Sequence, residues 1–117
     1  MDVIVRDLEG TPLLESRGDI DHSVCRSVEA ALREAIARGN DIVLIDLRLV
    51  PYIDSGGLSV LLSGVRMLRE RGWLGVIGPN ANVRRLLEIV GLLVDPDFRL
   101  FEDIEEAKTA MRQPVAT

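Results

Sequence analysis

The stretch DIVLIDLRLVPYIDSGGLSVLL, residues 41–62, decides the fold because it reads as a strand, a loop and a helix in succession. Residues 42–45 form a continuous apolar run rich in β-branched side chains, which is typical of a strand buried on both faces. Apolar residues then recur at spacings of three and four over residues 58–68, which predicts an amphipathic helix closed by Gly72. The loop at 48–54 therefore joins a buried strand to a helix, the unit from which parallel sheets are built.

Similar patterns lie on both sides of this unit. Upstream, apolar residues at 3–5 and 13–14 flank a turn that contains Gly and Pro, which predicts an antiparallel hairpin. A first helix is expected from about residue 24 to about residue 36, and Gly39 stops it. Downstream, the sequence predicts a strand at 73–77, a helix at 83–90 ended by Gly91, a short strand at 99–101 and a last helix at 103–112.

The resulting order is β-β-α-β-α-β-α-(β)-α, in which most strands are separated by helices. Strands joined by helical crossovers pair in parallel, and the hairpin adds an antiparallel edge. We therefore predict a single α/β domain over residues 1–117, with a mixed, mostly parallel sheet of four or five strands and about four helices. Its core is expected to span about residues 3–112, and residues 113–117 to form a flexible tail.

Length and composition limit the classes of function. The 117 residues fit one domain with a single core, and 19 acidic against 14 basic residues give a net charge of -5. That charge disfavours broad binding to nucleic acid or to anionic lipid. The single cysteine, Cys25, excludes an intrachain disulfide and is expected to be a small core or boundary residue. The start of the chain is unlike a signal peptide and no stretch is apolar enough to span a bilayer, so we expect a cytoplasmic protein.

Three loops are expected to meet at one edge of the sheet. They are residues 18–22, 48–54 and 78–82, and each follows a predicted strand. In open α/β sheets, ligands and partners contact the loops at the carboxyl ends of the strands. Ser55 lies where the middle loop joins its helix, so a functional site is expected there.

Ser55 could be a catalytic nucleophile, but the sequence around it argues against this. A nucleophilic serine needs a base, and the only histidine is His22, which is more typical of a surface loop residue. The pattern G-x-S-x-G is absent because Ile53 stands at its first glycine. No cluster has the spacing of metal ligands and no phosphate loop occurs, so we expect no metal, no cofactor and no enzymatic activity.

A second interpretation makes the pair Asp54 and Ser55 only a helix cap. The side-chain oxygens of both residue types accept hydrogen bonds from unpaired amides at a helix start. Gly56 and Gly57 follow, and each costs about 1 kcal/mol relative to Ala inside a helix. The cap does not explain that cost, but an amide edge left open to an oxyanion or to another protein's backbone would.

A third interpretation makes Ser55 a site of modification. A phosphate would add a charge of about -1.5 to -2, which the positive end of the following helix can accept. Asp54 and Asp21 would repel that charge, and a partner docked at this edge would have to desolvate it. One modification could thus leave the fold intact and remove a docking surface.

Four sequence blocks, taken together, resemble the STAS domains, specifically the bacterial anti-sigma factor antagonists. They are GDID at 18–21, IVLIDL at 42–47, YIDSGGL at 52–58 and NVRRLLEIVGL at 82–92, and the likeness covers about residues 3–112. The resemblance implies a STAS-like fold and a protein that binds an anti-sigma factor, itself an ATP-dependent serine kinase, and so releases a sigma factor. It also implies that the kinase phosphorylates Ser55 to switch the antagonist off and that a serine phosphatase reverses this.

The resemblance extends to individual residues of the site. Asp21 matches a family aspartate beside the acceptor serine, and Asp54 matches the aspartate of the motif. Gly56 replaces the second hydroxyl residue that is usual there, which leaves Ser55 as the single hydroxyl of that turn. The residues expected to contact the partner are Asp21, His22, Tyr52, Asp54, Gly56, Gly57, Leu58 and Asn80.

The resemblance leaves one alternative open. STAS domains also occur as non-catalytic subunits of lipid-transport or stress-signalling complexes, and in such a subunit Ser55 would be only a helix cap. Arg84 and Arg85 are interpreted as a solvated face with room for a partner contact, and Tyr52 as either an exposed docking residue or a packed one. The sequence is silent on whether the chain dimerises.

Overall fold

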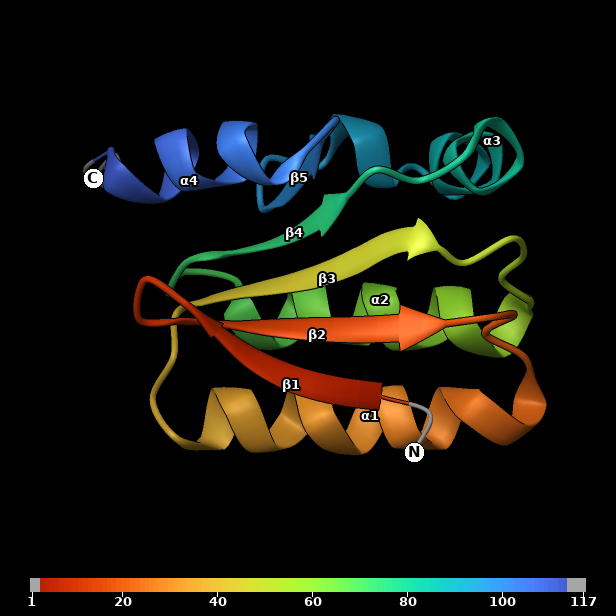
Figure 1. Ribbon diagram of the computed structural model, residues 1–117, viewed down its shortest axis with the longest axis horizontal. Helices are drawn as coiled ribbons and strands as arrows, with labels where there is room; N and C mark the ends of the chain where they lie inside the picture. Colours follow the sequence, from red (N-terminus) through yellow and green to blue (C-terminus); the bar gives the residue numbers. More distant parts are fainter. Residues whose placement is uncertain (1–2, 114–117) are drawn as a thin grey trace.

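A five-stranded sheet forms the centre of the fold, as predicted. The computed structural model describes residues 3–113 and places the strands in the order β1-β2-β3-β4-β5 (Figure 1). β1 pairs with β2 antiparallel and every other neighbouring pair is parallel. The strands are β1 (Val3–Leu8), β2 (Thr11–Arg17), β3 (Ile42–Leu49), β4 (Trp73–Ile77) and β5 (Phe98–Phe101).

The strand bounds correct the sequence analysis at one point. Residues 48 and 49 were expected in a loop, but β3 continues to Leu49, which pairs with Arg17 of β2. The register shifts between Glu15 and Arg17, so β3 carries an extra residue there. The hairpin turn consists of Glu9 and Gly10 alone, both with positive φ, the geometry that matches the twist of a two-stranded ribbon.

Within residues 3–113, three α-helices each join one strand to the next and a fourth follows β5, and every one of them begins at a polar cap. Asp21, Asp54, Asn80 and Asp103 each accept a hydrogen bond from a backbone amide of the first turn that follows. The sequence analysis missed one further element, the 3-10 turn η1 (Leu92–Val94) that follows Gly91. The helices are α1 (His22–Ala37), α2 (Ser55–Leu68), α3 (Ala81–Ile89) and α4 (Ile104–Arg112). Of the predicted tail, residues 114–117 lie outside the described residues.

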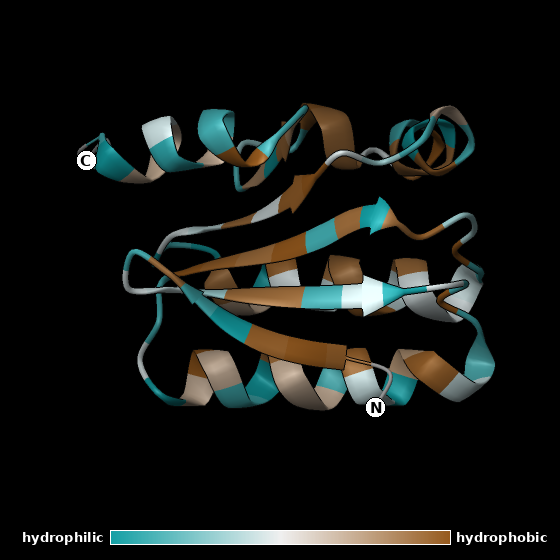
Figure 2. Ribbon diagram, in the orientation of Figure 1, coloured by the Kyte–Doolittle hydropathy of each residue, from teal (hydrophilic) through white to brown (hydrophobic). Residues whose placement is uncertain are grey.

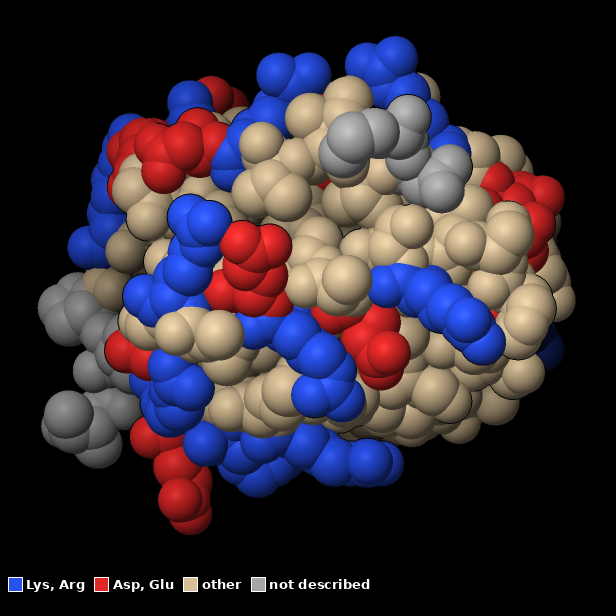
Figure 3. Space-filling model, turned by 90° about the horizontal axis from the view of Figure 1, so that it is seen from below, with Lys and Arg blue, Asp and Glu red and all other residues tan. Residues whose placement is uncertain are grey.

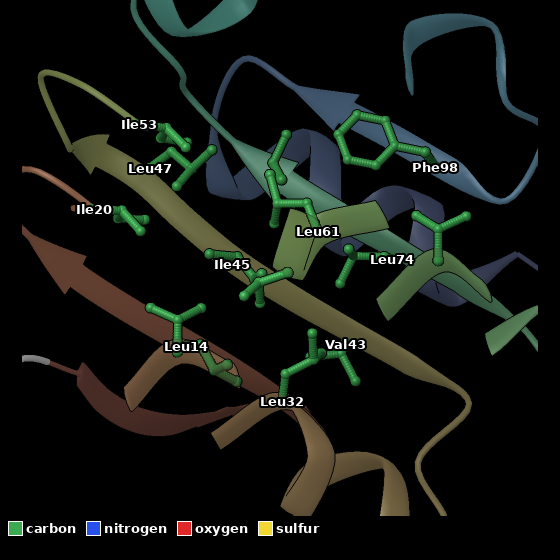
Figure 4. Packing of buried hydrophobic residues seen from close by; sticks show 14 of the residues in the cluster. Leu14, Ile20, Leu32, Val43, Ile45, Leu47, Ile53, Leu61, Leu74 and Phe98 are labelled. Carbon is green, nitrogen blue, oxygen red and sulfur yellow. The ribbon is translucent and has the colours of Figure 1, made fainter. Parts of the chain in front are cut away.

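The helices cover the two faces of the sheet unequally. α1 and α2 lie behind β1, β2 and β3 (Figure 1), and the apolar side chains between the layers form the larger core. Leu14 and Ile45 of the sheet meet Leu32 of α1 and Leu61 of α2 there (Figure 4). α4 contributes Ala107 to a smaller core on the other face. Figure 2 shows the apolar character of β3 and β4 against the mixed surfaces of the helices.

Two glycines fix how α2 is placed. A Cβ at Gly64 would lie 2.6 Å from Cδ2 of Leu32, so the glycine lets α1 and α2 approach closely. Gly72, expected to close the helix, lies four residues beyond the last helical residue, Leu68. Its hydrogen faces the carbonyl oxygen of Asp41, where a side chain would overlap, and its role is therefore a close backbone approach between loops.

Candidate functional site

The first two loops that were expected to converge are hydrogen-bonded to each other. The amide of Gly18 donates to the carbonyl of Leu49 at 2.8 Å, just beyond the paired ends of β2 and β3. Ile20 and Ile53 form a parallel bridge, flanked by bonds from the Ile20 amide to Tyr52 at 2.9 Å and from the Asp54 amide to Ile20 at 3.1 Å. This bridge continues the sheet by one step and confirms that the loops meet at its carboxyl edge.

The third loop is attached through Asn80. Its side-chain oxygen accepts from the amide of Val83 at 2.8 Å and so caps α3, while its side-chain nitrogen donates to the carbonyl of Pro51 at 3.1 Å. One side chain therefore fixes both the start of α3 and the loop that leads to Ser55. Asn80 was predicted from the sequence as a partner contact, and its bond to Pro51 was not foreseen, because nothing local to either residue signals a contact across 29 positions.

Ser55 is the first residue of α2 and its side chain is exposed. Asp54 is the cap, since its Oδ1 accepts from the amide of Gly57 at 2.9 Å. The interpretation of Ser55 as the capping group is therefore wrong, because that position belongs to the preceding residue. The side-chain hydrogen bonds found within residues 3–113 do not include the Ser55 hydroxyl, so it is free of a structural role there.

The two glycines after Ser55 have different environments. A Cβ at Gly57 would lie 2.6 Å from Cγ2 of Ile53 and 2.9 Å from Cγ2 of Ile20, so no side chain fits. The expectation of an open amide edge is wrong at this residue, which is buried and donates its amide to Asp54. A Cβ at Gly56 would make one tight contact, with Asp54 Oδ1 at 3.2 Å, and an ordinary van der Waals contact with the sulfur of Cys25 at 3.5 Å.

Cys25 packs against the core from α1, as a boundary residue. Its closeness to Gly56 was missed by the sequence analysis, since the two residues lie on different helices.

Two carboxylates lie at the same edge of the sheet as Ser55. Asp21 and Asp54 each directly follow a residue of the Ile20–Ile53 bridge, so both lie at the same edge. Asp21 caps α1, and its Oδ1 accepts from the hydroxyl of Ser23 at 2.7 Å and from the Ser23 amide at 3.0 Å. These bonds, the hydroxyl first, hold the pKa of Asp21 below its ordinary value and keep the carboxylate ionised.

The remaining predicted partner residues divide into exposed and buried ones. The side chain of Tyr52 is 51% exposed, and His22 and Asn80 are exposed as well. Gly57 and Leu58 are buried, and Leu58 packs within the larger core. Arg84 is exposed and forms an ion pair with Glu102 at 2.9 Å, and Arg85 is exposed. The outer surface of this edge therefore consists of aromatic, imidazole, amide and carboxylate groups around the Ser55 hydroxyl.

On the face of the molecule that Figure 3 shows, charge is unevenly distributed. This edge lies toward the right, where the surface is mostly uncharged with acidic atoms at its rim, and most of the visible Lys and Arg atoms lie toward the left and the middle. Among the described residues, no group of three or more His, Cys, Asp or Glu side chains is arranged to hold a metal ion. None of the described helices combines the length and the apolarity that crossing a bilayer requires. The Ser55 side chain is exposed at this edge.

Comparison with known proteins identifies the family. Residues 5–94 match the family model described as "Mlab, STAS domain". The chain belongs to the STAS domain family. This STAS domain is 31% identical over 110 residues to the anti-sigma-F factor antagonist RsfB of Mycobacterium tuberculosis, which covers 94% of this chain and 88% of the relative. It is 36% identical over 76 residues to the anti-sigma-B factor antagonist of Listeria monocytogenes, covering 64% and 67% of the two chains.

Solved structures share the fold of this STAS domain. An anti-sigma factor antagonist from Mycobacterium paratuberculosis superposes with a TM-score of 0.83 at 27% identity, over 95% of this chain and 93% of that one. Phosphorylated SpoIIAA of Bacillus superposes with a TM-score of 0.75 at 21% identity, over 94% and 99%, which supports the fold alone. The STAS-like α/β fold and the order of elements predicted from the sequence are therefore confirmed.

Proposed function

We propose that this STAS domain is an anti-sigma factor antagonist that binds an anti-sigma factor with serine kinase activity and is switched off by phosphorylation of Ser55. The observation that carries the proposal is that two adjacent residues have separate roles at the start of α2. Asp54 caps the helix, and the exposed hydroxyl of Ser55 stays free. The names of the relatives, antagonists of anti-sigma-F and anti-sigma-B factors, support the same class of partner.

The docking surface is the outer side of the carboxyl edge. Tyr52, His22 and Asn80 supply exposed side chains around Ser55, and Asp21 and Asp54 supply its acidic rim. Tyrosine is enriched at the centres of protein interfaces because it buries a large area at a small entropic cost. Gly57 and Leu58 support this surface indirectly, because they are buried and pack the first turn of α2 against the core.

The chemistry is supplied by the partner. The kinase brings Mg-ATP and a base, the Ser55 oxygen attacks the γ-phosphorus, and the bond from that phosphorus to the ADP oxygen breaks. The hydroxyl proton passes to the base of the kinase, which leaves phosphoserine on this chain and ADP on the partner. A serine phosphatase restores the alcohol by adding water across the phosphoester bond and releasing inorganic phosphate.

The phosphate acts on docking through charge. It adds about -1.5 to -2 beside the carboxylates of Asp21 and Asp54, and an interface closing over this site would have to remove water from all three groups. A hundredfold loss of affinity corresponds to only about 2.7 kcal/mol. The amides of Ser55 and Gly56 precede the first backbone hydrogen bond of α2, from Leu58 to Asp54, and lie at the positive end of the helix dipole, so the fold itself tolerates the added anion.

Intact-mass spectrometry after incubation with the kinase partner and ATP tests the proposal. The wild-type chain should gain one phosphate, and Ser55→Ala should gain none. Ser59→Ala is the matched control, because Ser59 is also exposed and lies one turn further along α2. Loss of uptake in both variants, or in neither, would refute Ser55 as the acceptor. No uptake together with tight binding to a permease or scaffold would instead support the subunit of a transport or stress-signalling complex.

A further inference from the structure

A second surface with a defined chemistry lies on the open face of the sheet. In Figure 1, no helix of residues 3–113 passes in front of β1, β2 and β3. Three arginine side chains stand on this face, and their exposed fractions are 53% for Arg6, 66% for Arg17 and 47% for Arg48. On a chain with a net charge of -5, three neighbouring cationic groups form a distinct surface.

The carboxylates that accompany these arginines are sunk between them. Glu15 of β2 lies directly opposite Asp46 of β3, and their side chains are only 13% and 6% exposed. Glu15 accepts from Nε of Arg6 at 2.8 Å and from Arg17 at 3.2 Å. Asp46 accepts from Nε and from a terminal nitrogen of Arg48, at 3.0 and 2.8 Å. The outermost atoms of each pair are therefore guanidinium groups.

Two exposed apolar side chains complete the same surface. Ile4 is the register partner of Glu15 and is 38% exposed, and Leu49 is the partner of Arg17 and is 56% exposed. Residues paired across neighbouring strands point to the same side of a sheet. We call this surface the arginine face; it consists of Ile4, Arg6, Glu15, Arg17, Asp46, Arg48 and Leu49.

We propose that the arginine face docks an acidic, amphipathic segment of a partner protein. An acidic partner is favoured by charge complementarity, because the outward guanidinium groups attract carboxylates. An amphipathic partner is favoured because Ile4 and Leu49 offer apolar contacts on the same surface. Glu15 and Asp46 hold the arginine side chains in place, so less conformational entropy is lost on binding. This docking requires neither Ser55 nor its phosphate and stands apart from the proposed function.

A titration with synthetic peptides tests the arginine face on the whole chain. The probe is a fluorescein-labelled helical peptide made of glutamate and leucine, and its counterpart carries lysine in place of glutamate. Fluorescence anisotropy gives the affinity, and the amide resonances of the labelled protein give the location. The acidic probe should bind, shift resonances of β1 to β3 and weaken as salt rises, and the lysine peptide should not bind.

Paired arginine variants separate a local surface from the overall charge. The double variant Arg6→Gln with Arg17→Gln should weaken binding of the acidic probe by about tenfold or more. Arg33→Gln removes an exposed arginine of α1, which is 58% exposed and paired with Glu29, and should change the affinity little. Equal weakening by Arg33→Gln, shifts confined to other elements, or binding to phosphatidylserine vesicles without binding of the acidic peptide would overturn the proposal.

Discussion

The carboxylate of Asp54 accepts a hydrogen bond from the amide of Gly57 at 2.9 Å and so caps α2. The side chain of Ser55, which follows Asp54 in the sequence, is therefore not needed to cap the helix. Helix initiation and the accessible alcohol are thus assigned to adjacent residues. A change at one of the two should therefore leave the contribution of the other intact.

Stability measurements can separate the roles of these two residues. Asp54→Ala should lower the free energy of unfolding by about 1 kcal/mol, because the Gly57 amide loses its cap. Ser55→Ala should change it by less than about 0.5 kcal/mol, as expected for an exposed side chain without partners. Urea denaturation followed by circular dichroism measures both values. Comparable losses in the two variants would contradict the assignment of the cap to Asp54.

Substitution of the two glycines should have unequal effects. Gly57→Ala should destabilise the fold by about 1–3 kcal/mol, since its Cβ would press on Ile20 and Ile53 and the core must shift. Gly56→Ala should cost less, because its closest contacts, Asp54 Oδ1 and the Cys25 sulfur, are 3.2 and 3.5 Å away. Thermal unfolding of both variants compares them directly. A larger loss for Gly56→Ala would show that the packing at Gly57 is looser than described.

Under the proposed function, affinity for the kinase partner should follow the charge at residue 55. Ser55→Ala should bind constitutively, and Ser55→Asp should weaken binding only in part, because aspartate carries about one negative charge and the phosphate nearly two. Isothermal titration calorimetry with the anti-sigma factor kinase measures both affinities, with Ser59→Asp as the control for a charge elsewhere on α2. Indistinguishable affinities for the Ala and Asp variants would rule out an electrostatic switch.

Ser16 of β2 is expected to lower the stability of the fold. Its side chain is 1% exposed, and its hydroxyl finds no hydrogen-bond partner among the described residues. A buried hydroxyl without a partner costs about 1–3 kcal/mol of desolvation. Ser16→Ala should therefore raise the free energy of unfolding by about 1 kcal/mol, measured by urea denaturation. A loss of stability would mean that the hydroxyl is satisfied in solution.

Acid should weaken the contacts of Arg69. This residue donates to Asp95 at 2.9 Å and to Asp97 at 2.7 Å, and its hydrogen bonds hold the pKa of Asp95 below the ordinary value of 3.8. A lowered carboxyl pKa contributes stability above the unfolded pKa, and that contribution is lost as the pH falls through the folded pKa. Asp95→Asn should thus lose less stability than wild type between about pH 5 and pH 2. Parallel pH profiles would contradict this coupling.

The arrangement of strands and helices could be predicted because local signals and topology agree. Apolar periodicity marked the helices, and Gly91, with φ of 83°, ended α3 where it was expected. β3 was predicted too short because its last residue is held by pairing with Arg17, a contact invisible in the local pattern. The turn η1 was missed because three residues are too few to show a period.

The place of the site in the fold could be predicted from the sequence, but the hydrogen bonds and steric contacts of its residues could not. The three loops converged as the strand order required, since parallel strands end on the same side. Asp54 and Ser55 were equally suited to cap a helix by residue type. The structure shows that Asp54, directly after the bridge between Ile20 and Ile53, is the cap and that α2 begins at Ser55. The same bridge excludes a side chain at Gly57, a steric limit that depends on residues far apart in the sequence.

The close packing of Gly57 against Ile20 and Ile53 has a consequence for signalling. If Ser55 is phosphorylated as proposed, the turn beneath it has little space in which to move. The modification is then expected to act locally, on the partner that contacts it, and not through a conformational change transmitted across the domain.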